Sequence, residues 1–207
     1  MLLTRIRCAT LVAAGLFISG GTASAHHLMG GKTPSTFTEG VLSGVGHPVI
    51  GPDHLAFLVA LGIAVGVSRI SLVNPFLFLV TMACGVLAHV AAVNIPAAEL
   101  VVAVSVLLAG VLLALDRRIP AGLWLGIFAL AGFFHGYAYG ESIYGAEPAP
   151  IVAYLVGLVA VQTALTVGVA FATRSLWTAA GVAPRLVGAA ISGVGFAVLI
   201  AQIVPSP

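Results

Sequence analysis

The segment 43–54 carries side chains that can bind a metal ion. It reads Ser-Gly-Val-Gly-His-Pro-Val-Ile-Gly-Pro-Asp-His, so two imidazoles and a carboxylate stand close together at His47, Asp53 and His54. Imidazole and carboxylate together suit nickel, cobalt or zinc better than magnesium or calcium. Asp53 also has a simpler interpretation, because an acidic residue in the first turn of a helix is stabilised by the helix dipole. The same dipole favours a neutral His54, and neutral imidazole is the form that binds metal.

A second set of polar side chains follows Phe133, at His135, Tyr139, Glu141 and Glu147. His135 and Tyr139 are four positions apart and share one face of a helix. We expect Gly140 to end that helix, so that Glu141 turns back toward the bundle. Tyr139 has two interpretations: it is an aromatic side chain at the membrane interface, or it is a hydrogen-bond partner that orients a metal ligand. Glu147 also has two interpretations, as a solvent-exposed side chain and as a metal ligand.

Other ionisable residues lie apart from these two segments. His89 stands in an apolar stretch, where a histidine either hydrogen-bonds to a neighbouring helix or belongs to a functional site. Glu99 opens a helix, and stabilisation by the helix dipole would explain it. His26 and His27 could capture metal or form part of a tail. Our predicted metal ligands are His47, Asp53, His54, His89, His135 and Glu141.

The composition places these groups in a membrane protein. The chain has 207 residues, of which 60% are hydrophobic and 7% charged, and its mean hydropathy is +1.18. Soluble domains carry about a quarter charged residues, so this chain lacks the charge to cover a water-facing surface. The net charge is +2 and no basic run occurs, which argues against nucleic acid as a partner. The phosphate-binding loop of ATP-hydrolysing proteins is also missing.

The N-terminal residues 1–25 resemble a secretory signal peptide. Arg5 and Arg7 precede the apolar run 8–18, and Ala23-Ser24-Ala25 matches a cleavage site. The alternative is an uncleaved first transmembrane helix, but the apolar run is shorter than the about 20 residues that cross a bilayer. We therefore predict cleavage, and one transmembrane transport domain at 26–207.

The fold class that follows is all-α, a polytopic bundle of about six transmembrane helices. The apolar segments lie near 54–71, 74–93, 98–115, 119–139, 149–173 and 183–204. Before the first span, glycine and proline predict a broken helix or re-entrant segment: a half-helix over 36–46 that ends at His47, and a new helix with Pro52 at its first position. Close helix packing is predicted where Gly-x-x-x-Gly occurs, at Gly40/Gly44, Gly62/Gly66 and Gly122/Gly126.

The basic residues orient this bundle. A signal peptide puts the mature N-terminus outside, and the first span then ends inside at Arg69. In this arrangement every arginine after the signal peptide is cytoplasmic, as the positive-inside rule requires. Only Lys32 lies outside. We predict a multi-pass protein of the cytoplasmic (inner) membrane, with its N-terminus and its histidines on the periplasmic side.

Two motifs resemble those of a known family. His47-Pro-x-x-Gly51-x-Asp53-His54 is similar to the signature of the HupE/UreJ family of membrane nickel/cobalt transporters, and Phe134-His135-Gly-x-Ala138-x-Gly140 resembles its second signature. One departure is Tyr139, where many members carry a second histidine. The resemblance implies a transported nickel ion, or cobalt, that supplies hydrogenase or urease maturation.

The predicted function is inward transport of that divalent metal, without enzymatic activity or a prosthetic group. Two alternatives stay open: an accessory protein that stores the metal or hands it to partners, and a membrane metalloenzyme with Glu141 as its general base. The polar side chains available for an inner path are few: Ser105, Gln162, Thr163 and Thr166. Besides the metal ion, the predicted partner is the lipid bilayer, and a homo-oligomer is left open.

Overall fold

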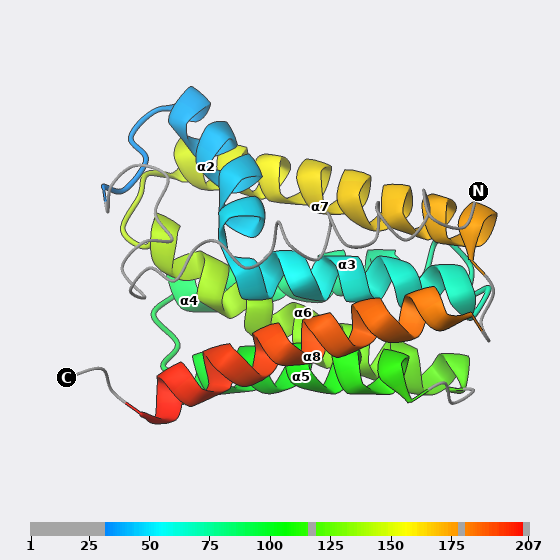
Figure 1. Cartoon of the computed structure of the whole chain (residues 1–207). Coiled ribbons are helices and arrows are strands. Elements are labelled where there is room, and N and C mark those ends of the chain that lie inside the picture. The colour runs from blue at the N-terminus through cyan, green and yellow to red at the C-terminus, as the bar shows by residue number, and fades with distance from the viewer. Residues whose placement is uncertain (1–31, 116–118, 178–180, 205–207) are drawn as a thin grey trace.

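The computed structural model describes residues 32–115, 119–177 and 181–204, and in these residues the secondary structure is helical. Figure 1 shows the long helices side by side along one direction, with α2 set at an angle to them. In chain order they are α2 (Phe37–Ile50), α3 (Pro52–Val67), α4 (Pro75–Val90), α5 (Ala98–Ala114), α6 (Ala121–Gly140), the 3-10 turn η2 (Glu141–Ile143), α7 (Pro148–Leu176) and α8 (Val182–Ile203).

The predicted all-α bundle is confirmed, and each of the six apolar segments is a helix. Their lengths differ, however. The helical segments 121–143, 148–176 and 182–203 are long and apolar enough to cross a bilayer, whereas α4 and α5 are shorter apolar helices. A helix rises 1.5 Å per residue, so these two fall somewhat short of a hydrocarbon core about 30 Å thick. Six complete spans therefore remain a prediction, and the predicted signal peptide lies outside the described residues.

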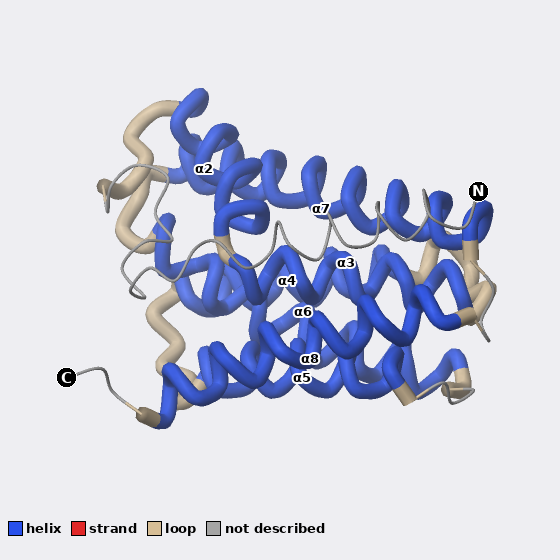
Figure 2. The backbone as a smooth tube through the Cα atoms, viewed as in Figure 1, coloured by secondary structure: helices blue, strands red, loops and turns tan. Residues whose placement is uncertain are grey.

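The helix break at Gly51 is the main departure from a simple bundle. α2 and α3 meet there at a bend of 78° and could together form one broken span or a re-entrant loop. Figure 2 shows the short loop between them. The predicted end of the half-helix at His47 was wrong, because α2 continues through Pro48 to Ile50. A proline in the last turn gives up one intrahelical hydrogen bond without stopping the helix, and the next proline begins α3.

Glycines let the helices approach closely. α2 packs on α7, α4 on α6, and α5 on α8. A Cβ atom on Gly44 would lie 2.2 Å from the carbonyl oxygen of Tyr154 on α7, so only glycine permits this contact between backbones. Of the predicted packing motifs, those at 40/44 and 62/66 contact α7. A Cβ atom on Gly122 or Gly126 would meet no atom of another described helix within 4 Å, so the prediction for that pair was wrong.

α3 lies at the centre of the bundle and carries most of the core. Its residues from Ala56 to Val65 include eight apolar side chains that are at most 1% exposed. Residues this apolar could face lipid, but here they are enclosed by α5, α7 and α8. The first turn of α3 holds Asp53 and His54 at one end of this core, so the central helix presents part of the first candidate motif to its neighbours.

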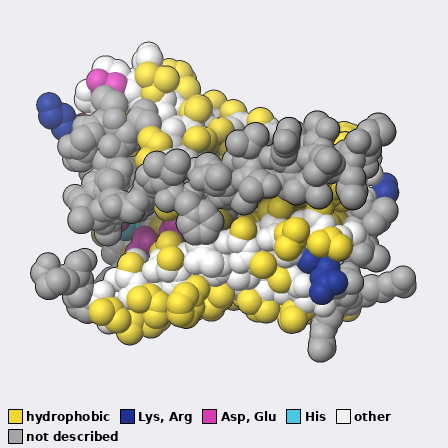
Figure 3. Space-filling view, viewed as in Figure 1, with side chains coloured by type: hydrophobic (Ala, Val, Ile, Leu, Met, Phe, Trp, Pro, Cys, Tyr) yellow, Lys and Arg dark blue, Asp and Glu magenta, His cyan; other side chains and the backbone are white. Residues whose placement is uncertain are grey.

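Charged residues are divided between the two ends of the bundle. Near the end of α7, Arg174 donates to the carbonyl of Ile70, and Arg69 donates to the carbonyl of Arg174. In Figure 3, histidine and acidic side chains lie together near one end of the visible face, and basic side chains mark the opposite end and the region beside α2. This distribution agrees with the predicted orientation, whose assignment of the two sides to inside and outside remains a prediction.

Candidate functional site

Three histidines from distant parts of the sequence meet in the interior. His47 comes from the last turns of α2, His54 from the first turn of α3, and His135 from α6. Their side chains are 6%, 5% and 0% exposed. The ring centroids lie 5.6 Å apart for His47 and His54, and 5.0 Å apart for His54 and His135. The bend at Gly51 makes the first approach possible, because it turns the end of α2 back toward the start of α3.

The hydrogen bonds of Ser105 determine the tautomer of His135. Ser105 Oγ donates its only hydrogen to the carbonyl of Val102 at 2.7 Å. The same oxygen lies 2.9 Å from His135 Nε2, so it must accept a hydrogen from that nitrogen. A neutral imidazole carries one N–H, and the Nδ1 atom of His135 is therefore the acceptor side of the ring.

This assignment extends to His54. The two Nδ1 atoms of His54 and His135 lie 2.9 Å apart. Since Nδ1 of His135 accepts, Nδ1 of His54 must donate, and the lone pair of neutral His54 then resides on Nε2. The chain of donors therefore runs from His54 through His135 and Ser105 to a backbone carbonyl of α5. Such partners set both the orientation and the tautomer of a metal-binding histidine.

His47 is held in a similar way by α7. The hydroxyl of Tyr154 donates to the backbone carbonyl of Tyr139 at 2.9 Å and lies 2.8 Å from His47 Nδ1. With its hydrogen used, the hydroxyl accepts from His47 Nδ1–H. Ser142 Oγ lies 2.9 Å from the same nitrogen. This pattern places the lone pair of neutral His47 on Nε2, as in His54.

Tyr139 packs between the histidines and is fully buried. Its ring centroid is 4.3 Å from that of His54 and 5.0 Å from that of His47. The interpretation as an interfacial aromatic does not apply to a side chain in this position. Its hydroxyl oxygen has no hydrogen-bond partner within the described part of the chain. Tyr139 therefore touches both imidazoles, and its phenol provides an oxygen beside them.

The carboxylates stand at different depths. Asp53 is 6% exposed, and one of its oxygens accepts from the backbone N–H of His54 at 2.8 Å, which agrees with a role at the helix N-terminus. Glu99 is half-buried and lies within electrostatic range of Asp53 and Glu141. α6 ends at Gly140, as predicted. The next side chain, however, is exposed Glu141, and it is Ser142 that turns inward.

His89 belongs to a neighbouring aromatic group. Its ring lies 4.6 Å from that of Tyr137 and 5.8 Å from that of Tyr144, between centroids. Tyr137 also donates to the carbonyl of Val93 and accepts from the N–H of Ile95, and so it anchors the loop after α4. The Nδ1 atom of His89 is buried without a hydrogen-bond partner among the described residues.

The histidine cluster is connected by hydrogen bonds and ring contacts. Within residues 32–115, 119–177 and 181–204, no three His, Cys, Asp or Glu side chains already form a group that could hold one metal ion. The predicted ligands therefore remain a prediction. His26 and His27 fall outside the described residues. Glu147 immediately precedes α7 and is exposed.

Sequence reasoning missed the residues that orient the imidazoles. The sequence predicts a role for Ser105 only in an inner path, and it predicts none for Ser142 or Tyr154. Tyr154 did carry a signal, because a tyrosine hydroxyl in an apolar span must find a partner when it is buried. The serines carried little signal, since a serine in an apolar helix often bonds to its own backbone.

Comparisons with known proteins relate this sequence to a curated protein and to a protein family. The curated protein HupE of Rhizobium leguminosarum bv. viciae is 28% identical over 166 residues, which cover 78% of this chain and 85% of that protein. No solved structure matches the chain. Residues 13–198 match the family described as "HupE / UreJ protein". This match includes both histidine motifs and every helix except the end of α8, and the chain therefore belongs to the HupE/UreJ family.

Proposed function

We propose that this protein transports a divalent transition metal, nickel or else cobalt, inward across the cytoplasmic membrane to supply hydrogenase or urease maturation. The HupE/UreJ family is associated with nickel and cobalt transport for those enzymes, and membership in it supports the choice of metal. The observation that carries the proposal is the pair of buried imidazoles, His47 and His54, on the two sides of the break at Gly51. Irregular backbone at membrane depth is tolerated where it lines a polar site.

The geometry of this pair suits two ligands of one ion. With a metal–nitrogen bond of about 2.1 Å, two coordinating imidazoles have ring centroids about 5 Å apart. The observed separation of His47 and His54 is 5.6 Å. Both rings carry the lone pair on Nε2 in the hydrogen-bonded arrangement, so neither must lose a proton before binding. In this proposal His47 and His54 coordinate the ion, and Asp53 compensates its charge.

His135 then acts in one of two ways. In the hydrogen-bonded arrangement it accepts from His54 Nδ1 and orients that ring, as the second partner of a metal-binding histidine does. It can also join the ion through its own Nδ1 once His54 turns away. Both roles require the hydrogen bond to Ser105, because that bond keeps the Nδ1 lone pair of His135 available. Glu99 and Glu141, whose charges influence each other, would attract the cation before it reaches the histidines.

Uptake by whole cells tests the ligand assignment. We expect nickel accumulation to fall to the background of cells without the protein when His47→Ala or His54→Ala is introduced. Cys84→Ala is a suitable control, since Cys84 is exposed on the surface of α4. Membrane levels of each variant must be equal by immunoblot. Accumulation equal to the wild type in both histidine variants would refute the assignment.

Purified protein in liposomes separates transport from the two alternatives. Flux of nickel into the lumen without turnover of a substrate supports a transporter. Tight binding of nickel without flux would instead indicate an accessory protein that stores or hands over the ion. Competition by cobalt and zinc in the same assay ranks the metals. Release of a chemical product would favour a metalloenzyme.

A further inference from the structure

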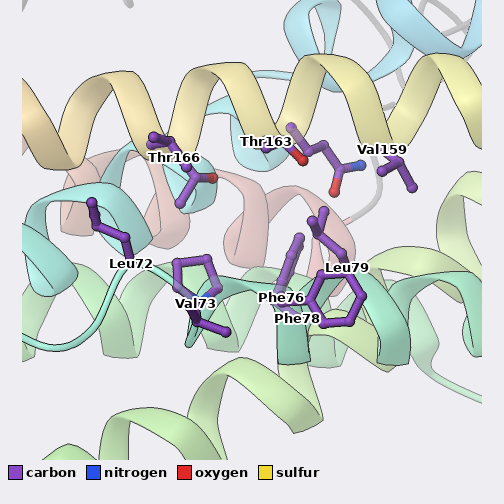
Figure 4. Close-up of a pocket in the computed structure, with 11 residues that line it drawn as sticks. Leu72, Val73, Phe76, Phe78, Leu79, Val159, Thr163 and Thr166 are labelled. Carbon is purple, nitrogen blue, oxygen red and sulfur yellow. The ribbon is translucent and has the colours of Figure 1, made fainter.

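A cavity with a few polar groups lies between α4 and α7, next to the histidine cluster but outside it. The cavity, of about 360 Å³, is bounded by the start of α4, the loop before it and the middle of α7. Figure 4 shows Val159, Thr163 and Thr166 along α7, with Leu72, Val73 and Leu79 across the space from them. Its walls are mostly apolar, and its polar groups come from one helix, α7.

Gln162 is the reason to assign a polar occupant. Gln162 is one of the residues that line this cavity and is 0% exposed, yet both its amide nitrogen and its amide oxygen lack a hydrogen-bond partner among the described residues. Leaving a buried amide unpaired is unfavourable, because the desolvation of its polar atoms is not compensated. A lipid chain in the cavity would leave that penalty in place. Water or a hydrated cation would remove it once the amide, whose nitrogen and oxygen are now inaccessible to solvent, turns into the cavity, and the volume is large enough for several water molecules.

Two phenylalanine rings separate the cavity from the histidines. Phe78 lines the cavity, and its ring centroid is 6.2 Å from that of His135. Phe57 stacks on Phe78 at 5.6 Å and lies 4.5 Å from His135, again between centroids. Each phenylalanine is 1% exposed. The histidine cluster and the cavity are therefore neighbours with an apolar partition between them.

The cavity also extends toward the arginine end of the bundle. Leu72 and Val73, which line it, belong to the loop that joins α3 to α4. The same loop contains Arg69 and Ile70, both of which hydrogen-bond with Arg174 at the end of α7. The histidines lie on the other side of the partition, toward the end at which Glu99 and Glu141 stand.

We propose that this cavity is a hydrated exit vestibule for the cation, with Gln162 as its ligand-binding side chain and Phe57 and Phe78 as the gate between it and the histidine site. The inference rests on the proposed transport function and addresses the nearly apolar half of the path. The amide oxygen of Gln162 and the hydroxyls of Thr163 and Thr166 would replace part of the water shell of a divalent cation leaving the histidines.

Thiol labelling tests hydration without any assumption about transport. Thr166→Cys is made in a Cys8→Ala/Cys84→Ala background, and right-side-out and inverted membrane vesicles are treated with a membrane-impermeant thiol reagent. Val156→Cys on the same helix is the control, because Val156 is 53% exposed and does not line the cavity. Thiolate forms in water and not in lipid, so we expect labelling at position 166 to be about tenfold faster than at the control, from the arginine end alone.

The gate is tested by adding Phe78→Ala to the Thr166→Cys protein. Removal of the ring should let the reagent reach position 166 from the histidine end as well. Labelling of Thr166→Cys no faster than the Val156→Cys control would overturn the vestibule and indicate lipid in the cavity. Labelling from the histidine end before Phe78 is changed would overturn the gate.

Gln162→Leu tests the role of the amide in transport. It replaces the amide by an apolar group of similar size, and we expect nickel flux into liposomes to fall about tenfold, as for loss of one hydrogen bond to a charged group. Thr163→Val provides a second variant with a smaller change in volume. Unchanged flux in both would overturn the role of these polar groups, whereas absence of flux in the parent protein would refute transport and leave the labelling result standing.

Discussion

The Nδ1 atoms of His54 and His135 lie 2.9 Å apart, although the two residues are 81 positions apart in the sequence. This contact joins the first turn of α3 to the interior of α6. Because Ser105 accepts the single N–H of neutral His135, at Nε2, Nδ1 of His135 must accept, and His54 is the donor in this contact. The hydrogen-bond chain thus couples both signature motifs of the family into a single site.

Ser105→Ala tests whether this chain prepares the site for metal. The variant removes the acceptor of His135 Nε2–H with little change in volume, so His135 is free to adopt the other tautomer. We expect nickel affinity to fall about tenfold or more, as is typical for loss of a partner that orients a metal-binding histidine. Isothermal titration of the detergent-solubilised protein measures this. Ser192→Ala is the control, since Ser192 Oγ donates to the carbonyl of Gly188 within α8; an equal loss in both variants would contradict the explanation.

Tyr154→Phe tests the partners of His47. It removes the hydroxyl that accepts from His47 and donates to the carbonyl of Tyr139. Ser142 remains within hydrogen-bond distance of His47, so we expect a partial loss, with nickel affinity about tenfold weaker. Tyr137→Phe removes an equally well bonded hydroxyl at the loop after α4 and should leave nickel affinity near that of the wild type. The same affinity for Tyr154→Phe as for the wild type would show that Ser142 alone is sufficient.

Gly51→Ala tests the bend between α2 and α3. A Cβ atom at this position would lie 2.8 Å from Cδ2 of His54, so the imidazole or the backbone must shift. We expect lower nickel uptake and a loss of stability of about 1–3 kcal/mol, as for other overpacked interiors. Gly168→Ala is the matched control, because a Cβ there would meet no atom of another helix within 4 Å in the part of the chain that the structure describes. Thermal unfolding and uptake are measured for both, and normal uptake by Gly51→Ala would show that His54 can move without harm.

Proton competition predicts the pH dependence of uptake. A histidine side chain has an ordinary pKa of about 6.5 and binds metal only when neutral. Binding is therefore strongest above this pKa and is lost as the external pH falls through it. Initial rates of nickel uptake between pH 5 and pH 8, with a constant membrane potential, measure the effect. Rates that rise toward pH 5 would argue against ligation by neutral histidines.

The amino-acid sequence by itself determined the class of the protein and its secondary structure. An apolar composition with few charges leaves lipid as the environment, and long apolar segments between prolines become helices because their backbone groups must be paired internally. The break near Gly51 was predictable for the same reason, since Pro52 begins a helix. The end of the first helix was predicted at His47 but lies at Ile50, because Pro48 is tolerated within the last turn of α2. Both motifs that identify the family were also visible in the sequence.

Only the tertiary structure decided which polar groups meet. Packing of α3 against α5, α6 and α7 placed Ser105, Ser142 and Tyr154 around the histidines, whereas Glu141 stayed exposed and His89 joined a separate aromatic group. A local sequence pattern specifies which face of one helix is apolar, but it does not specify the rotation of that helix against its neighbours when nearly every face is apolar. In this bundle glycine contacts such as Gly44 against Tyr154 set those rotations, and they do so through distances between backbones that no single segment encodes.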